Sequence, residues 1–236
     1  MYGASSIELI VLSATVAPFV LVILFKPKDI VSGDFYWATE KEGRFYLAVC
    51  DSTGHGVPGA FMSLLNISFL NEAISEKDIR QPNEVLNHAR QRLIENLSSE
   101  GAKDGMDGIL VCFDKNKNQI TYAAAHNAPI VVTSGVLEEL DSDNMPVGLA
   151  DRFDSFKHET LSTTQGTVLY LYTDGFADQF GGPRGKKFKY KQLNDLLLVN
   201  NSKTMTEQKD IFEKTFEGWK GNLEQVDDVL IIGIRL

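Results

Sequence analysis

The chain has 236 residues, of which 43% are hydrophobic and 23% charged, so it can form one large domain with a sizeable core. The formal net charge is −9 and no Lys/Arg cluster stands out as a nucleic-acid-binding stripe, which argues against nucleic acid as a partner. Cys50 and Cys112 lie within apolar runs, so we expect small buried side chains rather than a disulfide or a zinc site. This cysteine usage fits a reducing compartment and predicts a cytoplasmic protein.

The first apolar stretch covers residues 10–25 and contains Ser13, Thr15 and Pro18. It is shorter than the about 20 apolar residues that a bilayer span needs, and no cationic region precedes it as in a signal peptide. We therefore expect residues 1–18 to form an apolar linker, a candidate regulatory or dimer contact. A buried strand over about 19–26 then opens a domain over 19–236. A membrane anchor, or an arm that docks on a partner, is the alternative.

The pattern after residue 26 predicts an α+β fold with antiparallel hairpins. A helix over 58–76 has apolar residues around most of its circumference, so we expect it to be deeply buried. A polar, glycine-rich loop is expected over 180–187. The other expected helices cover 82–99, 191–199 and 206–219. The other expected strands cover 33–39, 44–50, 106–113, 119–124, 129–133, 136–140, a segment ending at 173, and 229–234.

Aspartates stand where four of these apolar runs begin or end. Asp34 precedes one run, Asp51 and Asp174 each follow one, and Asp227 and Asp228 precede the last. Taken alone, a strand-end aspartate is an ordinary turn or cap residue. Together, such carboxylates can converge at one end of a sheet, where hard divalent cations find oxygen ligands. The set therefore predicts a two-metal phosphohydrolase.

The hairpin formed by the strands over 33–39 and 44–50 bears on this prediction. A turn centred between Lys41 and Glu42 would place Asp34 opposite Val49, with Asp51 as its diagonal neighbour on the same face. A slip of one residue would instead separate the two carboxylates.

Six short segments resemble, in order, the motifs of the SpoIIE/RsbU-like serine phosphatases, the bacterial branch of the metal-dependent PPM protein phosphatases. The segments cover residues 31–37, 51–58, 125–129, 145–149, 172–175 and 226–229. The resemblance implies an αββα sandwich, in which two antiparallel sheets lie face to face and helices cover the outside. It also implies two Mn²⁺ or Mg²⁺ ions at one end of the sandwich, with a third, weaker site in some relatives.

Carried over by motif, the resemblance implies a role for each acidic position. Asp51 would bridge the two ions, and Asp34 and Asp174 would each hold an ion directly or through water. Asp227 is the expected ligand of the last motif, with Asp228 as the fallback. The backbone carbonyl of Ser52 would supply a further oxygen.

Two other positions have competing interpretations. Asp104 is the candidate for the third metal and Asp107 the alternative, against an ordinary loop before a strand. His55 lies in a glycine-rich turn beside Asp51 and could protonate the leaving oxygen as a general acid. We favour the interpretation that His55 fixes this turn by hydrogen bonding.

The resemblance implies a phosphoserine or phosphothreonine protein as substrate, typically a STAS-domain anti-sigma-factor antagonist in partner-switching signalling. A homodimer is compatible with the sequence. Two rivals remain: a pseudophosphatase that binds a phosphoprotein without turnover, and a membrane-anchored signalling protein.

Overall fold

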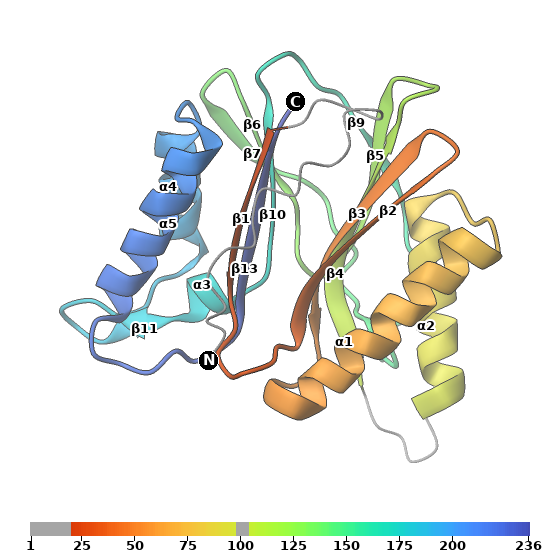
Figure 1. Ribbon diagram of the computed structural model, residues 1–236, viewed down its shortest axis with the longest axis horizontal. Helices are drawn as coiled ribbons and strands as arrows, with labels where there is room; N and C mark the ends of the chain where they lie inside the picture. Colours follow the sequence, from red (N-terminus) through yellow and green to blue (C-terminus); the bar gives the residue numbers. More distant parts are fainter. Residues whose placement is uncertain (1–19, 98–103) are drawn as a thin grey trace, which may run out of the picture.

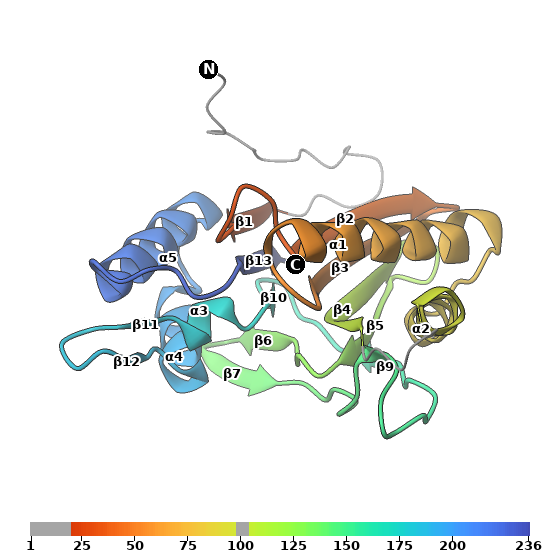
Figure 2. The same cartoon turned by 90° about the horizontal axis from the view of Figure 1, so that it is seen from below.

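Two antiparallel sheets lie face to face, and helices cover the outer side of each, as the computed structural model shows in Figures 1 and 2. The structure describes residues 20–97 and 104–236. The expected apolar segment over 1–18 lies outside these residues. The α+β fold class and the αββα sandwich predicted from the sequence are confirmed.

The first sheet has five strands in the order β1 (Val20–Lys26), β13 (Val229–Arg235), β10 (Val168–Tyr172), β6 (Ile130–Thr133) and β7 (Val136–Glu139). The second sheet runs through β2 (Asp34–Lys41), β3 (Arg44–Ser52), β4 (Gly105–Asp114), β5 (Gln119–Ala125) and β9 (Glu159–Leu161). The short β8 (Val147–Gly148) pairs with the start of β4.

Each sheet carries its own helices. The helices of the second sheet are α1 (Gly56–Asn71), a π-helical turn (Glu72–Glu76) and α2 (Pro82–Leu97). The helices of the first sheet are α3 (Gly175–Asp178), α4 (Tyr190–Asn200) and α5 (Met205–Lys220). Between α3 and α4, the expected loop over 180–187 is a small hairpin of β11 (Phe180–Gly181) and β12 (Lys186–Lys187).

Alternation along the strands sorts the core into three layers. In β3, Phe45, Leu47 and Val49 face the opposite sheet, whereas the residues between them face α1 and α2. In β13, Leu230 and Ile232 likewise face the opposite sheet. A strand that is buried on both faces needs apolar residues at every position, which explains the continuous apolar runs in the sequence.

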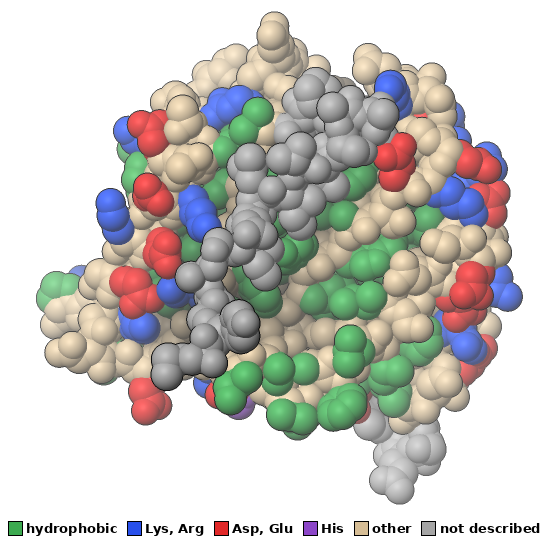
Figure 3. All heavy atoms as spheres, viewed as in Figure 1, with side chains coloured by type: hydrophobic (Ala, Val, Ile, Leu, Met, Phe, Trp, Pro, Cys, Tyr) green, Lys and Arg blue, Asp and Glu red, His purple; other side chains and the backbone are tan. Residues whose placement is uncertain are grey.

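The helix α1 is less buried than its sequence predicts. Val57, Phe61 and Leu64 expose 62%, 64% and 63% of their surface. These side chains lie on the outer side of α1, away from the second sheet, and Figure 3 shows hydrophobic side chains along this face. The expectation of deep burial was wrong because only the inner side of α1 packs against β2 and β3.

The register of the β2–β3 hairpin also differs from the prediction. Glu42 and Gly43 both have positive φ, 51° and 75°, and form a two-residue turn that suits a hairpin. The turn is thus centred one residue later than expected, so Asp34 pairs directly with Asp51 rather than with Val49. Both carboxylates remain on one face because the register shifts by two residues.

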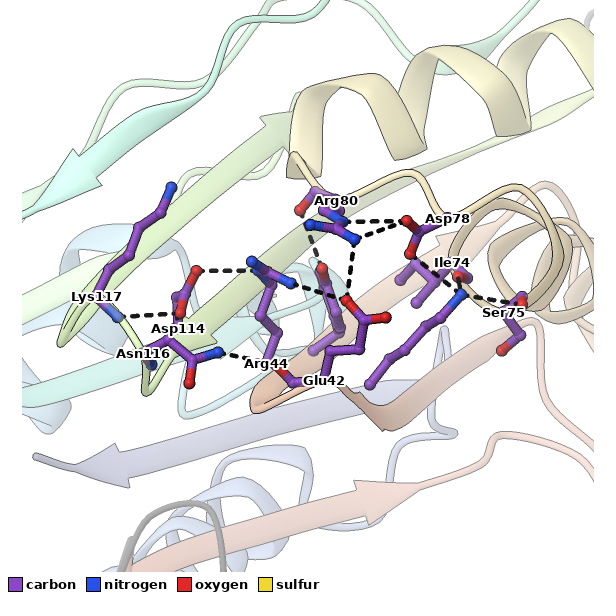
Figure 4. Close-up of polar contacts among 11 residues, drawn as sticks. Glu42, Arg44, Ile74, Ser75, Asp78, Arg80, Asp114, Asn116 and Lys117 are labelled. Atoms are coloured by element: carbon purple, nitrogen blue, oxygen red, sulfur yellow. Dashed lines mark hydrogen bonds and ion pairs between the residues drawn. The ribbon is translucent and has the colours of Figure 1, made fainter.

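A polar network fixes this turn at the end of the second sheet that lies opposite the aspartates (Figure 4). Arg44 Nε donates to Asp114 Oδ2 at 3.0 Å, which joins the β2–β3 turn to the end of β4. Lys41 Nζ donates to the carbonyl oxygens of Ile74 and Ser75 at 2.9 and 3.1 Å. These carbonyls lie near the end of the π-helical turn and lack helical partners, so the lysine ties this helix end to β2.

Candidate active site

Three carboxylates form a row across the second sheet. Asp34, Asp51 and Asp107 are neighbours on β2, β3 and β4, because Asp51 pairs with Asp34 on one side and with Asp107 on the other. Asp51 continues the alternation of Val49, and Asp107 that of Ile109, and both of these residues face the opposite sheet. The row therefore points into the space between the sheets, at the end where the apolar core ends.

The first sheet brings two more carboxylates to the same end. Asp174 follows the last residue of β10, and Asp227 lies two residues before β13, which is the neighbour of β10. Both carboxylates act electrostatically on Asp51, so the two sheets contribute to one acidic cluster. Figure 1 shows the start of α1, α3 and the chain that enters β13 at this end of the sandwich.

Thr173 links the two sheets at the cluster. Its hydroxyl donates to Asp34 Oδ2 at 2.6 Å and accepts from the backbone N–H of Leu230 at 3.0 Å. Thr173 is 1% exposed and Asp34 is 3% exposed, so this is a buried link between β10, β13 and β2. It fixes the orientation of the Asp34 carboxyl.

Burial and mutual repulsion perturb the acidic cluster. Burial, followed by the charge of Asp51, raises the pKa of Asp34 well above the usual range. Burial, followed by the charges of Asp174 and Asp227, likewise raises the pKa of Asp51. Burial, followed by Asp227, raises the pKa of Asp174 to about 6. Bound cations would favour the ionised carboxylates, since an opposite charge lowers the pKa of an acid.

Asp228 has a different position from its neighbour. It is 2% exposed, and its two carboxylate oxygens accept from the backbone N–H groups of Lys28 and Gly33 at 2.7 and 2.9 Å. These bonds hold the segment between β1 and β2. Asp227 instead lines the cavity described below and accepts from the N–H of Asp228 at 2.9 Å. This geometry favours Asp227 over the fallback Asp228 as a ligand.

Asp107, rather than Asp104, stands in the carboxylate row. Asp104 precedes β4, whereas Asp107 lies within β4 and pairs with Asp51. Burial raises the pKa of Asp107. His126 Nδ1 donates a hydrogen bond to Asp107 Oδ1 at 2.8 Å. Sequence reasoning did not identify His126 as a contact of a site carboxylate. The signal lay in the 125–129 motif, which ends β5 beside β4.

A cavity of about 250 Å³ opens over the cluster. It is lined by Asp51, Ser52, Thr53, Gly54, His55, Gly105, Met106, Asp107, Pro146 and Asp227. The Ser52 side chain points away from the row and accepts from Asn66 Nδ2 at 3.0 Å. His55 Nδ1 lies 3.1 Å from Asp29 Oδ2, a contact that supports the turn-fixing interpretation of this residue.

The donor set suits hard divalent cations. Carboxylates from both sheets meet at one cavity, and Mg²⁺ and Mn²⁺ prefer such oxygen ligands. In the described part of the chain, no three His, Cys, Asp or Glu side chains stand close enough together to hold an ion without moving.

Comparison with known proteins identifies the family. The family model described as Stage II sporulation protein E (SpoIIE) matches residues 41–236. The chain belongs to the SpoIIE family. A solved structure of the SiaA-PP2C domain of Pseudomonas aeruginosa is 31% identical, has a TM-score of 0.83 and aligns over 92% of this chain and 85% of that one. The resemblance inferred from the six motifs is confirmed.

Other relatives have lower sequence identity to this chain. The phosphoserine phosphatase RsbU of Bacillus subtilis (strain 168) is 23% identical over 64% of this chain and 44% of its own length. The phosphoserine phosphatase RsbP of the same organism is 26% identical over 63% of this chain and 37% of its own length. The chain thus spans less than half the length of these two relatives. The PP2C phosphatase domain of B. subtilis SpoIIE shares the fold, with a TM-score of 0.74 at 18% identity over 93% of this chain and 64% of that one.

Proposed function

We propose that this SpoIIE-family chain is a metal-dependent phosphatase that hydrolyses phosphoserine or phosphothreonine in a protein. The observation that carries the proposal is the meeting of Asp34, Asp51, Asp174 and Asp227, from both sheets, at one end of a PP2C-like sandwich. The names of the relatives RsbU and RsbP support phosphoserine as the group that is hydrolysed. Among the described residues that line the cavity there is no cysteine, so the set favours attack by water over a phosphocysteine intermediate.

The carboxylates would hold two Mn²⁺ or Mg²⁺ ions. Asp51 would contact both ions, Asp34 and Asp174 would each contact one, and Asp227 and the Ser52 carbonyl would complete the set. When bound, the ions supply an activated water and stabilise charge on the phosphate. A protein of the same fold, RsbX, has been solved in complex with magnesium, with a TM-score of 0.62 to this chain. A third, weaker ion would bind near Asp107.

The residues around the carboxylates would orient them and shape the cavity. Thr173 would keep Asp34 in position by its hydrogen bond, and His126 would do the same for Asp107. His55 would hold the turn at the mouth of the cavity through Asp29, with a general-acid role as the alternative. The strands behind the site are buried in the core, which suits a group of residues that must position phosphate.

The substrate we propose is a phosphorylated STAS-domain protein of a partner-switching pathway, as the family resemblance implies. The enzyme would act in the cytoplasm, and a homodimer remains compatible with this function.

The direct test is phosphate release from a phosphoserine protein or peptide under Mn²⁺ and Mg²⁺ titration. We expect hydrolysis that depends on the metal and that is lost by about 100-fold or more in Asp51→Asn, because one oxygen ligand for both ions becomes a neutral amide. Asp195→Asn, on the exposed face of α4, is the matched control and should keep full activity. Metal-independent hydrolysis, or equal activity in both variants, would contradict the proposal.

A further inference from the structure

The hairpin of β11 and β12 and the start of α4 carry a dense group of positive charges. Five of the 23 Lys and Arg residues of the chain occur within eight positions, and no acidic residue occurs from 179 to 194. All five are exposed, in a chain whose net charge is −9. We name this set the cationic hairpin, and it consists of Arg184, Lys186, Lys187, Lys189 and Lys191.

Most of these charges have no acidic partner among the residues that the structure describes. Lys187 Nζ lies 2.8 Å from Asp178 Oδ2 and 5.9 Å from the ring centroid of Phe180. No described carboxylate forms an ion pair with any of the other four cations. Four like charges close together repel one another, and a negatively charged partner would relieve this repulsion.

The cationic hairpin borders the candidate active site. Asp178, which holds Lys187, ends the short helix α3 that follows directly after Asp174. Tyr190 begins α4, and its ring centroid lies 6.2 Å from that of Tyr172, the last residue of β10. Figure 1 shows the hairpin projecting outward from α3. The positive surface thus begins at the edge of the carboxylate cluster and extends away from it.

Lys189 and Tyr190, at the start of α4, are notable residues of this surface. Tyr190, whose ring lies beside that of Tyr172 at the end of β10, stands between Lys189 and Lys191 in the chain. Lys189 has φ 76° and ψ 148°, a backbone conformation that glycine adopts at lower cost. A charged side chain is therefore present where the backbone favours glycine.

We propose that the cationic hairpin binds an acidic segment of the substrate protein, next to the phosphorylated residue that enters the carboxylate site. The proposal rests on the proposed function for the nature of the substrate. A phosphorylated residue arrives within a polypeptide, so its neighbours must lie over the rim of the cavity. Asp and Glu side chains at these positions would pair with Arg184, Lys186, Lys189 and Lys191. The hairpin would then select among phosphoproteins by charge.

The test uses two fluorescently labelled phosphoserine peptides of equal length, one flanked by Asp and Glu and the other by Gln and Ser. Binding is measured by fluorescence anisotropy, and kcat/KM by phosphate release with Mn²⁺. The variant is the triple change Arg184→Gln, Lys186→Gln and Lys191→Gln. The matched control is Lys77→Gln, Lys117→Gln and Lys214→Gln, which removes three exposed charges on other elements.

We expect the wild type and the control to prefer the acidic peptide by about tenfold in binding and in kcat/KM, since each exposed ion pair contributes modestly. The triple variant should lose this preference, mainly through KM. Added salt should weaken the preference of the wild type.

Equal preference in the triple variant and the wild type would overturn the proposal. So would the absence of any preference in the wild type, including the case in which the wild type binds phosphatidylserine vesicles instead. The anisotropy measurement tests the hairpin proposal separately from the proposed phosphatase function, because it records binding without hydrolysis. If no peptide is hydrolysed but the charge preference in binding is present and lost in the triple variant, the hairpin proposal stands and the proposed phosphatase function fails.

Discussion

At the scale of single residues, position within a strand decides which aspartates can act together. Asp107 and Asp104 are three residues apart, but only Asp107 lies opposite Asp51 in the ladder. Asp227 and Asp228 are adjacent, and only Asp228 has both oxygens occupied by backbone N–H groups. Alternation along a strand separates neighbours in sequence and aligns residues that are far apart.

Asp107→Asn should weaken Mn²⁺ binding by roughly tenfold or more, because the change removes a carboxylate charge from the row. Asp104→Asn is the matched control and should bind Mn²⁺ as the wild type does. Titration calorimetry with Mn²⁺ measures both variants. Equal affinities, or a loss confined to Asp104→Asn, would contradict the assignment of Asp107 to the site.

Gly175→Ala should destabilise the protein by about 2–3 kcal/mol, because the structure leaves no room for the added methyl group. A Cβ at this position would lie 1.9 Å from the carbonyl oxygen of Asp228, where α3 crosses the entry to β13. Gly218→Ala, in α5, has open space and should raise stability by up to about 1 kcal/mol. Urea unfolding of both variants measures the difference, and equal effects would exclude the close contact at Gly175.

At the scale of elements, the two ends of the second sheet have different roles. The aspartates occupy one end of β2, β3 and β4, and the network around Arg44 and Asp114 closes the other end. The network holds the hairpin in the register that pairs Asp34 with Asp51. A residue far from the site thus supports its geometry.

Asp114→Ala should cost about 2 kcal/mol of stability, because it leaves the Arg44 guanidinium, 15% exposed, without its main partner. Asp114 Oδ1 also accepts from the backbone N–H of Asn116, a bond that would be lost. Asp154→Ala breaks an ion pair with Arg152 that is 64–67% exposed and should change stability by less than about 0.5 kcal/mol. Chemical denaturation compares the two, and a similar cost in both would show that the Arg44 pair contributes little.

At the scale of the whole molecule, the site joins two sheets whose facing sides otherwise carry the apolar side chains of the central core layer. Like charges gather at this junction, so the fold is strained there unless cations are present. The cluster therefore couples the stability of the sandwich to pH and to divalent metal.

The metal-free protein should lose stability as the pH rises. The folded-state pKa of Asp174 is about 6, above the ordinary value of 3.8, and those of Asp34 and Asp51 are also raised. The folded state thus binds protons more tightly than the unfolded state. Below about pH 4, these carboxyls are protonated in both states, and their ionisation costs the folded state no stability. The penalty grows as the pH rises through the folded-state values. For Asp174 alone it reaches about 3 kcal/mol.

Thermal unfolding in EDTA and in Mn²⁺, between about pH 5 and about pH 9, tests this coupling. Mn²⁺ should raise the unfolding temperature most at high pH, because the ions then replace the missing protons. Asp51→Asn should flatten the pH dependence and reduce the effect of Mn²⁺. A metal-free wild type whose stability falls with pH no more steeply than that of Asp51→Asn would contradict the coupling.

Sequence patterns determined the classes of element and the family. Continuous apolar runs predicted the doubly buried strands, and six ordered segments predicted a SpoIIE-like phosphatase, because such local patterns reflect burial and site chemistry directly. Only the tertiary structure decided which residues lie together. The turn at Glu42 and Gly43 set the register of the β2–β3 hairpin, and the pairing of β3 with β4 placed Asp107 beside Asp51. The exposure of the outer side of α1 and of the cationic hairpin depends on which other elements pack against them. Strand pairing and the burial of a helix face depend on contacts between segments that are distant in the chain, so no local sequence pattern could determine them.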